Sequence, residues 1–159
     1  MAFLSIVVTF AARALLVMLF LPFSALDKLL NFKAALGQAD EATSSQTLAT
    51  VLILAGFCVE VLMSLAILTG IADRMAALIL AGYCGVTALL WKQFWKAPDF
   101  RLQGTSCGRD IFWDFLKNLA LAGGFLVLAF GASSAGLRTF LTHPLASTHP
   151  YALNEKAGG

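Results

Sequence analysis

The chain has 159 residues, of which 59% are hydrophobic and only 13% are charged, and its formal net charge is +2. A soluble domain is about half apolar and about a quarter charged. This composition therefore excludes an ordinary soluble protein and indicates an integral membrane protein in a lipid bilayer. The small and scattered positive charge also argues against a nucleic-acid partner.

Four apolar segments are long enough to cross the hydrocarbon core of a membrane, which takes about 20 helical residues. The first has no basic residue before Arg13, unlike a secretory signal peptide, and we interpret it as a retained helix. We expect an all-α fold, an antiparallel four-helix transmembrane bundle. The expected spans are about residues 3–30, 48–69, 75–94 and 111–131, within a domain over 1–137 that precedes a polar, flexible tail over 138–159.

The connections between the spans set their order and orientation. Residues 70–74 are so short a turn that the second and third spans must be antiparallel neighbours. Gly70 suits the end of one helix, and Asp73 suits the N-cap of the next. Basic residues are more frequent in and around the first and third loops, which favours these loops in the cytoplasm and both termini outside.

Two charged residues lie deep within their spans when helix rise is counted from the start of each span. Glu60 stands in the middle of the second span and Arg13 in the middle of the first. An unpaired charge at the bilayer centre costs about 2.5–3.5 kcal/mol. We therefore expect a buried ion pair between Arg13 and Glu60. Either this pair fixes the register of the helices, or Glu60 has a functional role in moving a proton.

A second polar group opens the fourth span. Asp114, Lys117 and Asn118 share one helix face because they are three and four residues apart. Lys28, at the end of the first span, belongs to the same side of the membrane. We predict a polar pocket there, with Lys28, Lys117 and Asn118 as ligand-binding residues and Glu60 or Asp114 as the candidate catalytic proton donor. Alternatively, Lys117 reaches inward toward Glu60.

Aromatic residues gather around the loop between the third and fourth spans. Such a cluster is typical of membrane anchoring at the headgroup interface, and the alternative is an aromatic-lined mouth of a ligand site. The residues are Trp91, Phe94, Trp95, Phe100, Phe112, Trp113 and Phe115.

The chain has no complete catalytic or cofactor-ligand motif. Its three cysteines form no CxxC pair, and both histidines, His143 and His149, follow the spans. We therefore expect no metal and no covalently bound cofactor, and the sequence leaves open whether the protein is an enzyme.

Three stretches, taken in order, resemble the DoxX-like family of small four-helix integral membrane proteins. They are "ARALLVMLFLPFSALDKLLNF", "EVLMSLAILTGIADRMAALIL" and "FLKNLALAGGFLVLAFG", and the resemblance covers about residues 13–131. It implies that the recurrent polar positions of the family are Arg13, Lys28, Glu60, Arg74, Lys117 and Asn118.

Several functional expectations follow from the resemblance, because the family includes subunits linked to thiosulfate–quinone oxidation and members associated with thiol redox systems. The leading expectation is a subunit or accessory protein of a quinone-linked redox system in the bacterial inner membrane. Its partners would be quinone and another membrane or redox subunit. The alternative is a non-catalytic structural or assembly subunit of a larger membrane complex. A pathway for protons or small solutes is a third interpretation.

Overall fold

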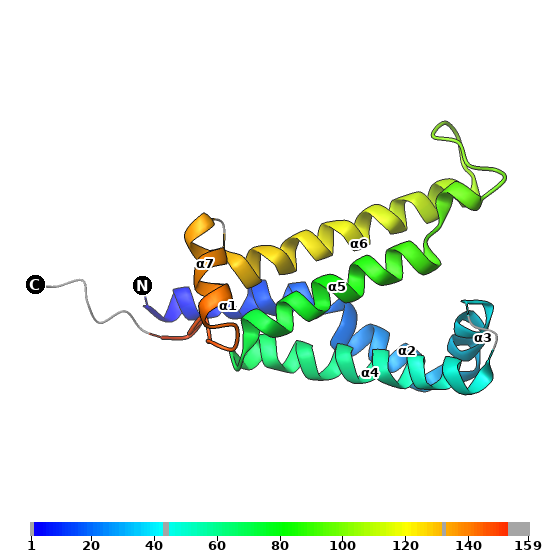
Figure 1. Cartoon of the computed structure of the whole chain (residues 1–159). Helices are drawn as coiled ribbons and strands as arrows, with labels where there is room; N and C mark the ends of the chain where they lie inside the picture. The colour runs from blue at the N-terminus through cyan, green and yellow to red at the C-terminus, as the bar shows by residue number, and fades with distance from the viewer. Residues whose placement is uncertain (1, 43–44, 132, 153–159) are drawn as a thin grey trace, which may run out of the picture.

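The computed structural model describes residues 2–42, 45–131 and 133–152, and every regular element in this part of the chain is helical. Four helical stretches are long and apolar enough to cross a membrane, and they lie side by side in alternating directions (Figure 1). The predicted all-α, four-span bundle is thus confirmed. Each stretch begins somewhat earlier than the sequence suggests: they are Ala2–Leu30, Gln46–Thr69, Asp73–Lys96 and Cys107–Phe130.

The first span is built from three consecutive helical pieces. Helix α1 (Ala2–Val17) continues into a π-helical segment, η1 (Leu19–Ser24), and then into α2 (Ala25–Leu30). Pro22 lies inside η1. Proline has no N–H to donate and its ring clashes with the carbonyl four residues earlier, so a widened, bent turn is the local solution. Helix α3 (Phe32–Ala42) follows and packs against α4.

A tight turn joins the second and third spans. Helix α4 (Gln46–Thr69) ends at Gly70, whose φ of 78° is the left-handed conformation predicted for it. Helix α5 (Asp73–Trp91) follows Ala72, which also has positive φ, and no side chain caps its first turn. The prediction of Asp73 as the N-cap is therefore wrong, because its carboxylate is engaged elsewhere.

The start of α6 (Cys107–Phe130) is held by a folded loop. Ser106 accepts a hydrogen bond from the Arg109 N–H at 3.2 Å, and the Asp99 carboxylate accepts from the N–H groups of Cys107 and Gly108 at 2.7 and 3.0 Å. Helix N-termini leave such donors unpaired. The short 3-10 helix η2 (Phe94–Lys96) places Phe94 among the predicted aromatic cluster, 5.0–5.4 Å from the ring centroids of Phe112, Trp95, Phe100 and Phe115.

The core lies where α5 packs against α6 and α4. Alanines on α5 and α6 let the helices approach closely, and larger side chains from these and the other helices fill the remaining space. Apolar side chains also cover the outer faces of the spans, as a lipid-facing surface requires. The fully packed residues include Val17, Phe20, Ile67, Ala77, Leu80, Ala81, Phe125 and Ala129.

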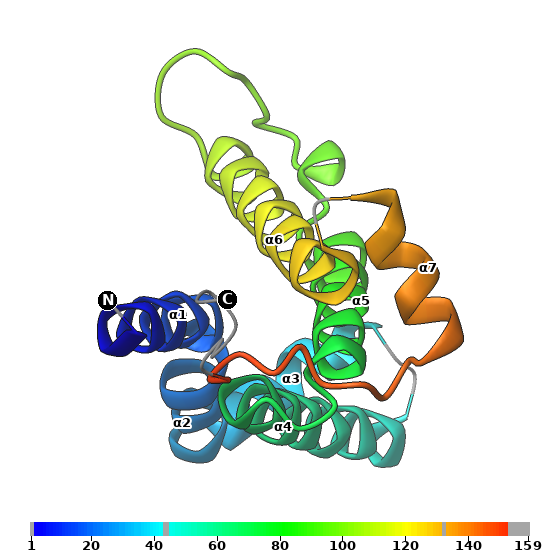
Figure 2. The same ribbon diagram turned by 90° about the vertical axis from the view of Figure 1, so that its left-hand side faces the viewer.

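The C-terminal part of the chain packs onto one end of the bundle. Helix α7 (Ser134–Thr142) lies against α6, with the Phe130 and Phe140 rings 5.1 Å apart. Residues 143–152 then cross the ends of α5 and α4 (Figure 2). A Cβ at Gly70 would lie only 2.8 Å from Pro150. The tail expected over residues 138–159 thus includes the end of α7 and a segment that packs on the bundle, while 153–159 lie outside the described residues.

Candidate functional site

Glu60 is the centre of a buried polar cluster between the first, second and third spans. Its side chain is 2% exposed. Its Oε1 atom accepts hydrogen bonds from Lys28 Nζ at 2.6 Å, the Tyr83 hydroxyl at 2.7 Å and the Ser24 hydroxyl at 3.1 Å. The Lys28 contact is also an ion pair, and Lys28 Nζ donates to Ser24 at 2.9 Å. Glu60 is thus paired with a charge from the first span, as its depth demands.

Local structure explains why these groups meet at one carboxylate oxygen. Ser24 and Lys28 are four residues apart and share one face of the helical pieces η1 and α2. Gly56 precedes Glu60 by one turn of α4, and a Cβ built on Gly56 would lie 3.1 Å from the Tyr83 hydroxyl oxygen. The missing side chain at Gly56 therefore leaves room for Tyr83 to reach Glu60 from α5.

Asp114 organises a second cluster, closer to solvent, at the start of α6. It forms ion pairs with Lys92 Nζ at 3.2 Å and Lys117 Nζ at 3.1 Å. The Asn118 side-chain amide donates to the backbone oxygen of Asp114 at 2.9 Å. Lys117 is 72% exposed, so these pairs contribute little to stability. The alternative in which Lys117 reaches Glu60 is wrong, because Lys28 occupies that place.

A single cavity of about 530 Å³ joins the two clusters. It contains all five residues that the sequence suggests for ligand binding or proton transfer, namely Lys28, Glu60, Asp114, Lys117 and Asn118. Its remaining polar lining comes from Ser24, Tyr83, Thr87 and Lys92. Apolar and aromatic side chains form the rest of the wall: Leu19, Phe20, Ala35, Ile53, Trp91 and Leu121.

Arg13 does not contact Glu60, and the predicted ion pair between them is wrong. Its Nη2 atom lies 2.8 Å from Asp73 Oδ2, and Nη1 donates to the backbone oxygen of Ile67 at 2.6 Å. The physical reason is the length of the first span: with 29 residues it exceeds the bilayer core, so counting from its start does not fix depth. Arg13 therefore lies level with the α4–α5 turn.

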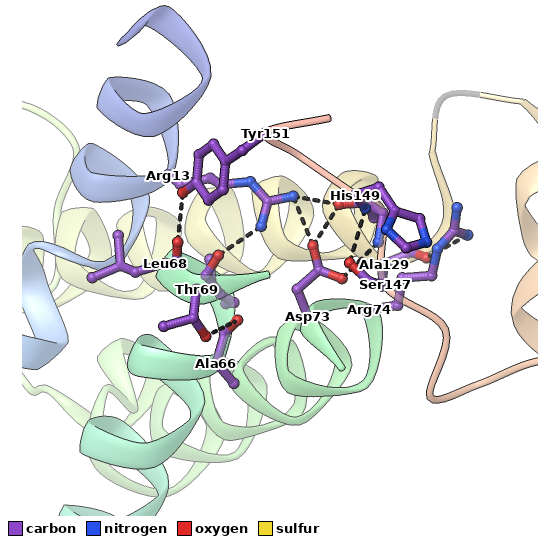
Figure 3. A network of polar contacts seen from close by, with 12 residues as sticks. Arg13, Ala66, Leu68, Thr69, Asp73, Arg74, Ala129, Ser147, His149 and Tyr151 are labelled. Atoms are coloured by element: carbon purple, nitrogen blue, oxygen red, sulfur yellow. Dashed lines mark hydrogen bonds and ion pairs between the residues drawn. The ribbon is translucent and has the colours of Figure 1, made fainter. Parts of the chain in front are cut away.

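The C-terminal segment completes the Arg13–Asp73 pair (Figure 3). The Thr148 hydroxyl donates to Asp73 Oδ2 at 2.5 Å and accepts from Arg13 at 2.6 Å, while its backbone N–H donates to Asp73 Oδ1 at 2.9 Å. Tyr151 donates its hydroxyl to the Leu68 carbonyl at 2.5 Å. Asp73 is fully buried, and four segments of the chain meet at this network.

Sequence reasoning missed five of the polar residues in these clusters: Ser24, Asp73, Tyr83, Lys92 and Thr148. Only Ser24 had a signal in the sequence, because it stands one helical turn before Lys28 and so shares its helix face. Tyr83 lies on α5 and Lys92 immediately follows its last residue, in a span for which the sequence suggested no site residue. Asp73 and Thr148 are 75 residues apart, and no local pattern links them.

The Glu60 carboxylate has unused capacity to accept hydrogen bonds. Among the described residues, its Oε2 atom is buried without a hydrogen-bond partner, although Oε1 has three. A carboxylate can accept about four hydrogen bonds, and a buried acceptor left unsatisfied costs about 1–3 kcal/mol. Lys28 Nζ donates to two oxygens and an ammonium has three donors. Lys28 and Glu60, which both line the cavity, therefore keep one donor and one acceptor that no described residue uses.

Within the same described part of the chain, no group of three or more His, Cys, Asp or Glu side chains could hold a metal ion. The polar lining of the cavity consists of ammonium, amide, hydroxyl and carboxylate groups. Such a lining can hydrogen-bond an organic ligand and exchange protons with it.

Comparison with known proteins covers the spans that supply most of this site. The family model described as DoxX matches residues 8–93, which include Arg13, Lys28, Glu60, Asp73 and Tyr83. No curated protein and no solved structure matches the chain. The matched region is more than half of the chain and covers all of the second span and most of the first and third. The chain is an integral membrane protein that belongs to the DoxX family.

Proposed function

We propose that the cavity between the four spans binds a quinone and that the chain is a subunit or accessory protein of a quinone-linked membrane redox system. The observation that carries the proposal is the lining of this one cavity, in which Lys28, Lys117 and Asn118 converge between apolar walls. Its volume of about 530 Å³ falls within the range of small-molecule sites, about 300–1,000 Å³.

The lining suits the two chemical parts of a quinone. A quinone ring is flat and apolar on its faces, and aromatic side chains on the wall, Phe20, Tyr83 and Trp91, can pack against it. Its carbonyl oxygens need donors. Lys92 and Lys117 each use one of three ammonium donors on Asp114, which leaves capacity for a ligand.

Glu60 and Asp114 are the groups that could exchange a proton with a bound quinone. Both line the cavity, at its buried and its exposed cluster respectively. Both form ion pairs with lysines of the same cavity. The proposal further locates the protein in the bacterial inner membrane, with another membrane or redox subunit as its partner.

Quinone content and quinone binding test this proposal. The protein is purified in mild detergent, its co-purifying lipids are extracted and examined by mass spectrometry, and its thermal unfolding is followed with added short-chain quinone. We expect a quinone in the extract and a rise in the unfolding temperature. Lys117→Met should reduce that rise, and Lys96→Met should not, because Lys96 lies outside the cavity. Absence of quinone together with no thermal shift contradicts the proposal.

The exposed face of α6 favours a second candidate, a non-catalytic assembly role in a larger membrane complex. Of the four spans, α6 buries the smallest share of its most apolar stretch. Its exposed apolar residues, including Trp113, Leu119 and Val127, suit either lipid or a neighbouring subunit. Native mass spectrometry of the solubilised protein distinguishes the assembly role from the quinone-binding role. A stable partner without quinone supports the assembly role, and an isolated monomer counts against it.

A further inference from the structure

Glu60 presents one fully used and one unused oxygen to its surroundings. Oε1 accepts from Lys28, Ser24 and Tyr83, whereas Oε2 is buried and accepts from no described residue. Ser64, one turn further along α4, has a buried hydroxyl that is likewise without a partner, so it does not satisfy Oε2. Glu60 also lines the cavity. The carboxylate is therefore an acceptor that a cavity ligand can complete.

We infer that Oε2 accepts a hydrogen bond from a ligand hydroxyl, so that the site binds the hydroquinone form in preference to the quinone. The inference rests on the proposed function and assigns the ligand's redox form. A hydroquinone O–H donates to a carboxylate and relieves its unmet acceptor. A quinone carbonyl is itself an acceptor, so it cannot donate to Oε2 and the two oxygens repel each other.

The other polar groups of the cavity do not make this distinction. Lys28, Lys92 and Lys117 are donors, and the Asn118 amide can donate or accept, so each can bond to a carbonyl oxygen or to a hydroxyl oxygen. Asp114, the other carboxylate of the cavity, already accepts from Lys117 at Oδ1 and from Lys92 at Oδ2. Tyr83 already donates its proton to Glu60 at 2.7 Å. Discrimination between the two forms of the ligand therefore resides in Glu60, as a specificity-determining residue.

Binding of matched ligands to the detergent-solubilised full chain tests the inference without any substitution. The probes are decylubiquinone, its hydroquinone under anaerobic conditions, and the dimethyl ether of that hydroquinone. A charge-assisted hydrogen bond predicts that the hydroquinone binds on the order of tenfold more tightly than the quinone. The dimethyl ether, which has no O–H, should lose this advantage.

Substitution of Glu60 provides the second measurement. Glu60→Gln removes the negative charge and adds an N–H donor, so the ratio of quinone to hydroquinone dissociation constants should fall to near one. Ser64→Ala and Asp110→Asn are the controls. The first removes the neighbouring orphan hydroxyl, and the second removes a carboxylate that does not line the cavity. Both should keep the preference of the unmodified protein.

The outcomes separate this inference from the proposed function. Equal affinity of the unmodified protein for quinone and hydroquinone overturns the inference and leaves quinone binding intact. A preference for hydroquinone that survives Glu60→Gln also overturns it, since another group would then select the ligand. If neither form binds, the proposed function itself fails, and the inference fails with it.

Discussion

Arg13 and Asp73 form a buried ion pair that joins the first span to the start of the third, with 2.8 Å between Nη2 and Oδ2. Glu60 and Lys28 form a second buried pair, with 2.6 Å between Oε1 and Nζ. The first span thus supplies the basic residue of both pairs, while the third span supplies Asp73 and the second span supplies Glu60. No described side-chain hydrogen bond links the two networks, so each should respond separately to substitution.

The Arg13–Asp73 pair should show strong coupling in a double-mutant cycle. Arg13→Leu or Asp73→Leu alone leaves a buried charge unpaired, and we expect each to lower the free energy of unfolding by about 3–5 kcal/mol. The double substitution should cost less than the sum of the two single ones. Reversible unfolding in mixed detergent micelles measures the four free energies. Additive losses would show that the pair contributes no coupling energy.

The same cycle on Glu60 identifies its true partner. Glu60→Leu should destabilise the protein more than Glu60→Leu combined with Lys28→Leu, because the single change strands the Lys28 ammonium near the apolar interior. Glu60→Leu combined with Arg13→Leu should instead be additive to within about 0.5 kcal/mol, since the two side chains share no partner. Coupling to Arg13 and additivity with Lys28 would contradict this assignment.

Thr148 should fasten the C-terminal segment to the bundle. Thr148→Val removes a hydroxyl that bonds to both Arg13 and Asp73, and we expect a loss of about 1–3 kcal/mol because buried charged groups lose a partner. Thr142→Val is the matched control, since the Thr142 hydroxyl bonds only to carbonyls of its own helix, Arg138 and Thr139, and is exposed.

Limited proteolysis measures this effect directly. Cleavage within residues 143–152 should become faster in the Thr148→Val protein and stay unchanged in the Thr142→Val protein, because the segment opens more often when its anchor is lost. Equal cleavage rates in the two variants would show that Thr148 does not hold the segment.

Hydrophobicity and turn residues were sufficient to predict the fold. The four spans are long apolar stretches, and the Gly70 turn forces the second and third into antiparallel contact. The turn depends on a few neighbouring residues, and the spans depend on the bilayer, which stabilises any apolar helix long enough to cross it. The cluster of Asp114, Lys117 and Asn118 was predictable for the same reason, since it depends only on helix periodicity.

Pairing between spans could not be predicted in the same way. Depth was counted from the start of each span, yet the 29-residue first span can slide along the membrane normal and contains the η1 bend. Its register is set by contacts with α4 and α5, which sequence spacing does not encode. Asp73 is an example. From sequence, an aspartate at a helix start is expected to cap that helix, but in the fold its buried carboxylate binds Arg13 and Thr148 instead.

Gly56 on α4 should not tolerate a larger side chain, because Tyr83 passes close to it to reach Glu60. A methyl group at Gly56 would lie 3.1 Å from the Tyr83 hydroxyl oxygen, so Gly56→Ala must displace Tyr83 and weaken its hydrogen bond to Glu60. We expect a loss of about 1–3 kcal/mol. Gly82→Ala is the control: its new methyl group meets nothing within 4 Å, and alanine favours a helix over glycine by about 1 kcal/mol.

A second background tests whether the hydroxyl of Tyr83 is the cause. In the Tyr83→Phe protein the colliding oxygen is gone, and the nearest ring carbons lie 3.6–3.7 Å from the new methyl group, which is ordinary contact. Gly56→Ala should therefore cost much less there than in the unmodified protein, as the difference between two unfolding free energies. An equal cost in both backgrounds would place the clash elsewhere, whereas recovery would show that Gly56 is small because Tyr83 must reach Glu60.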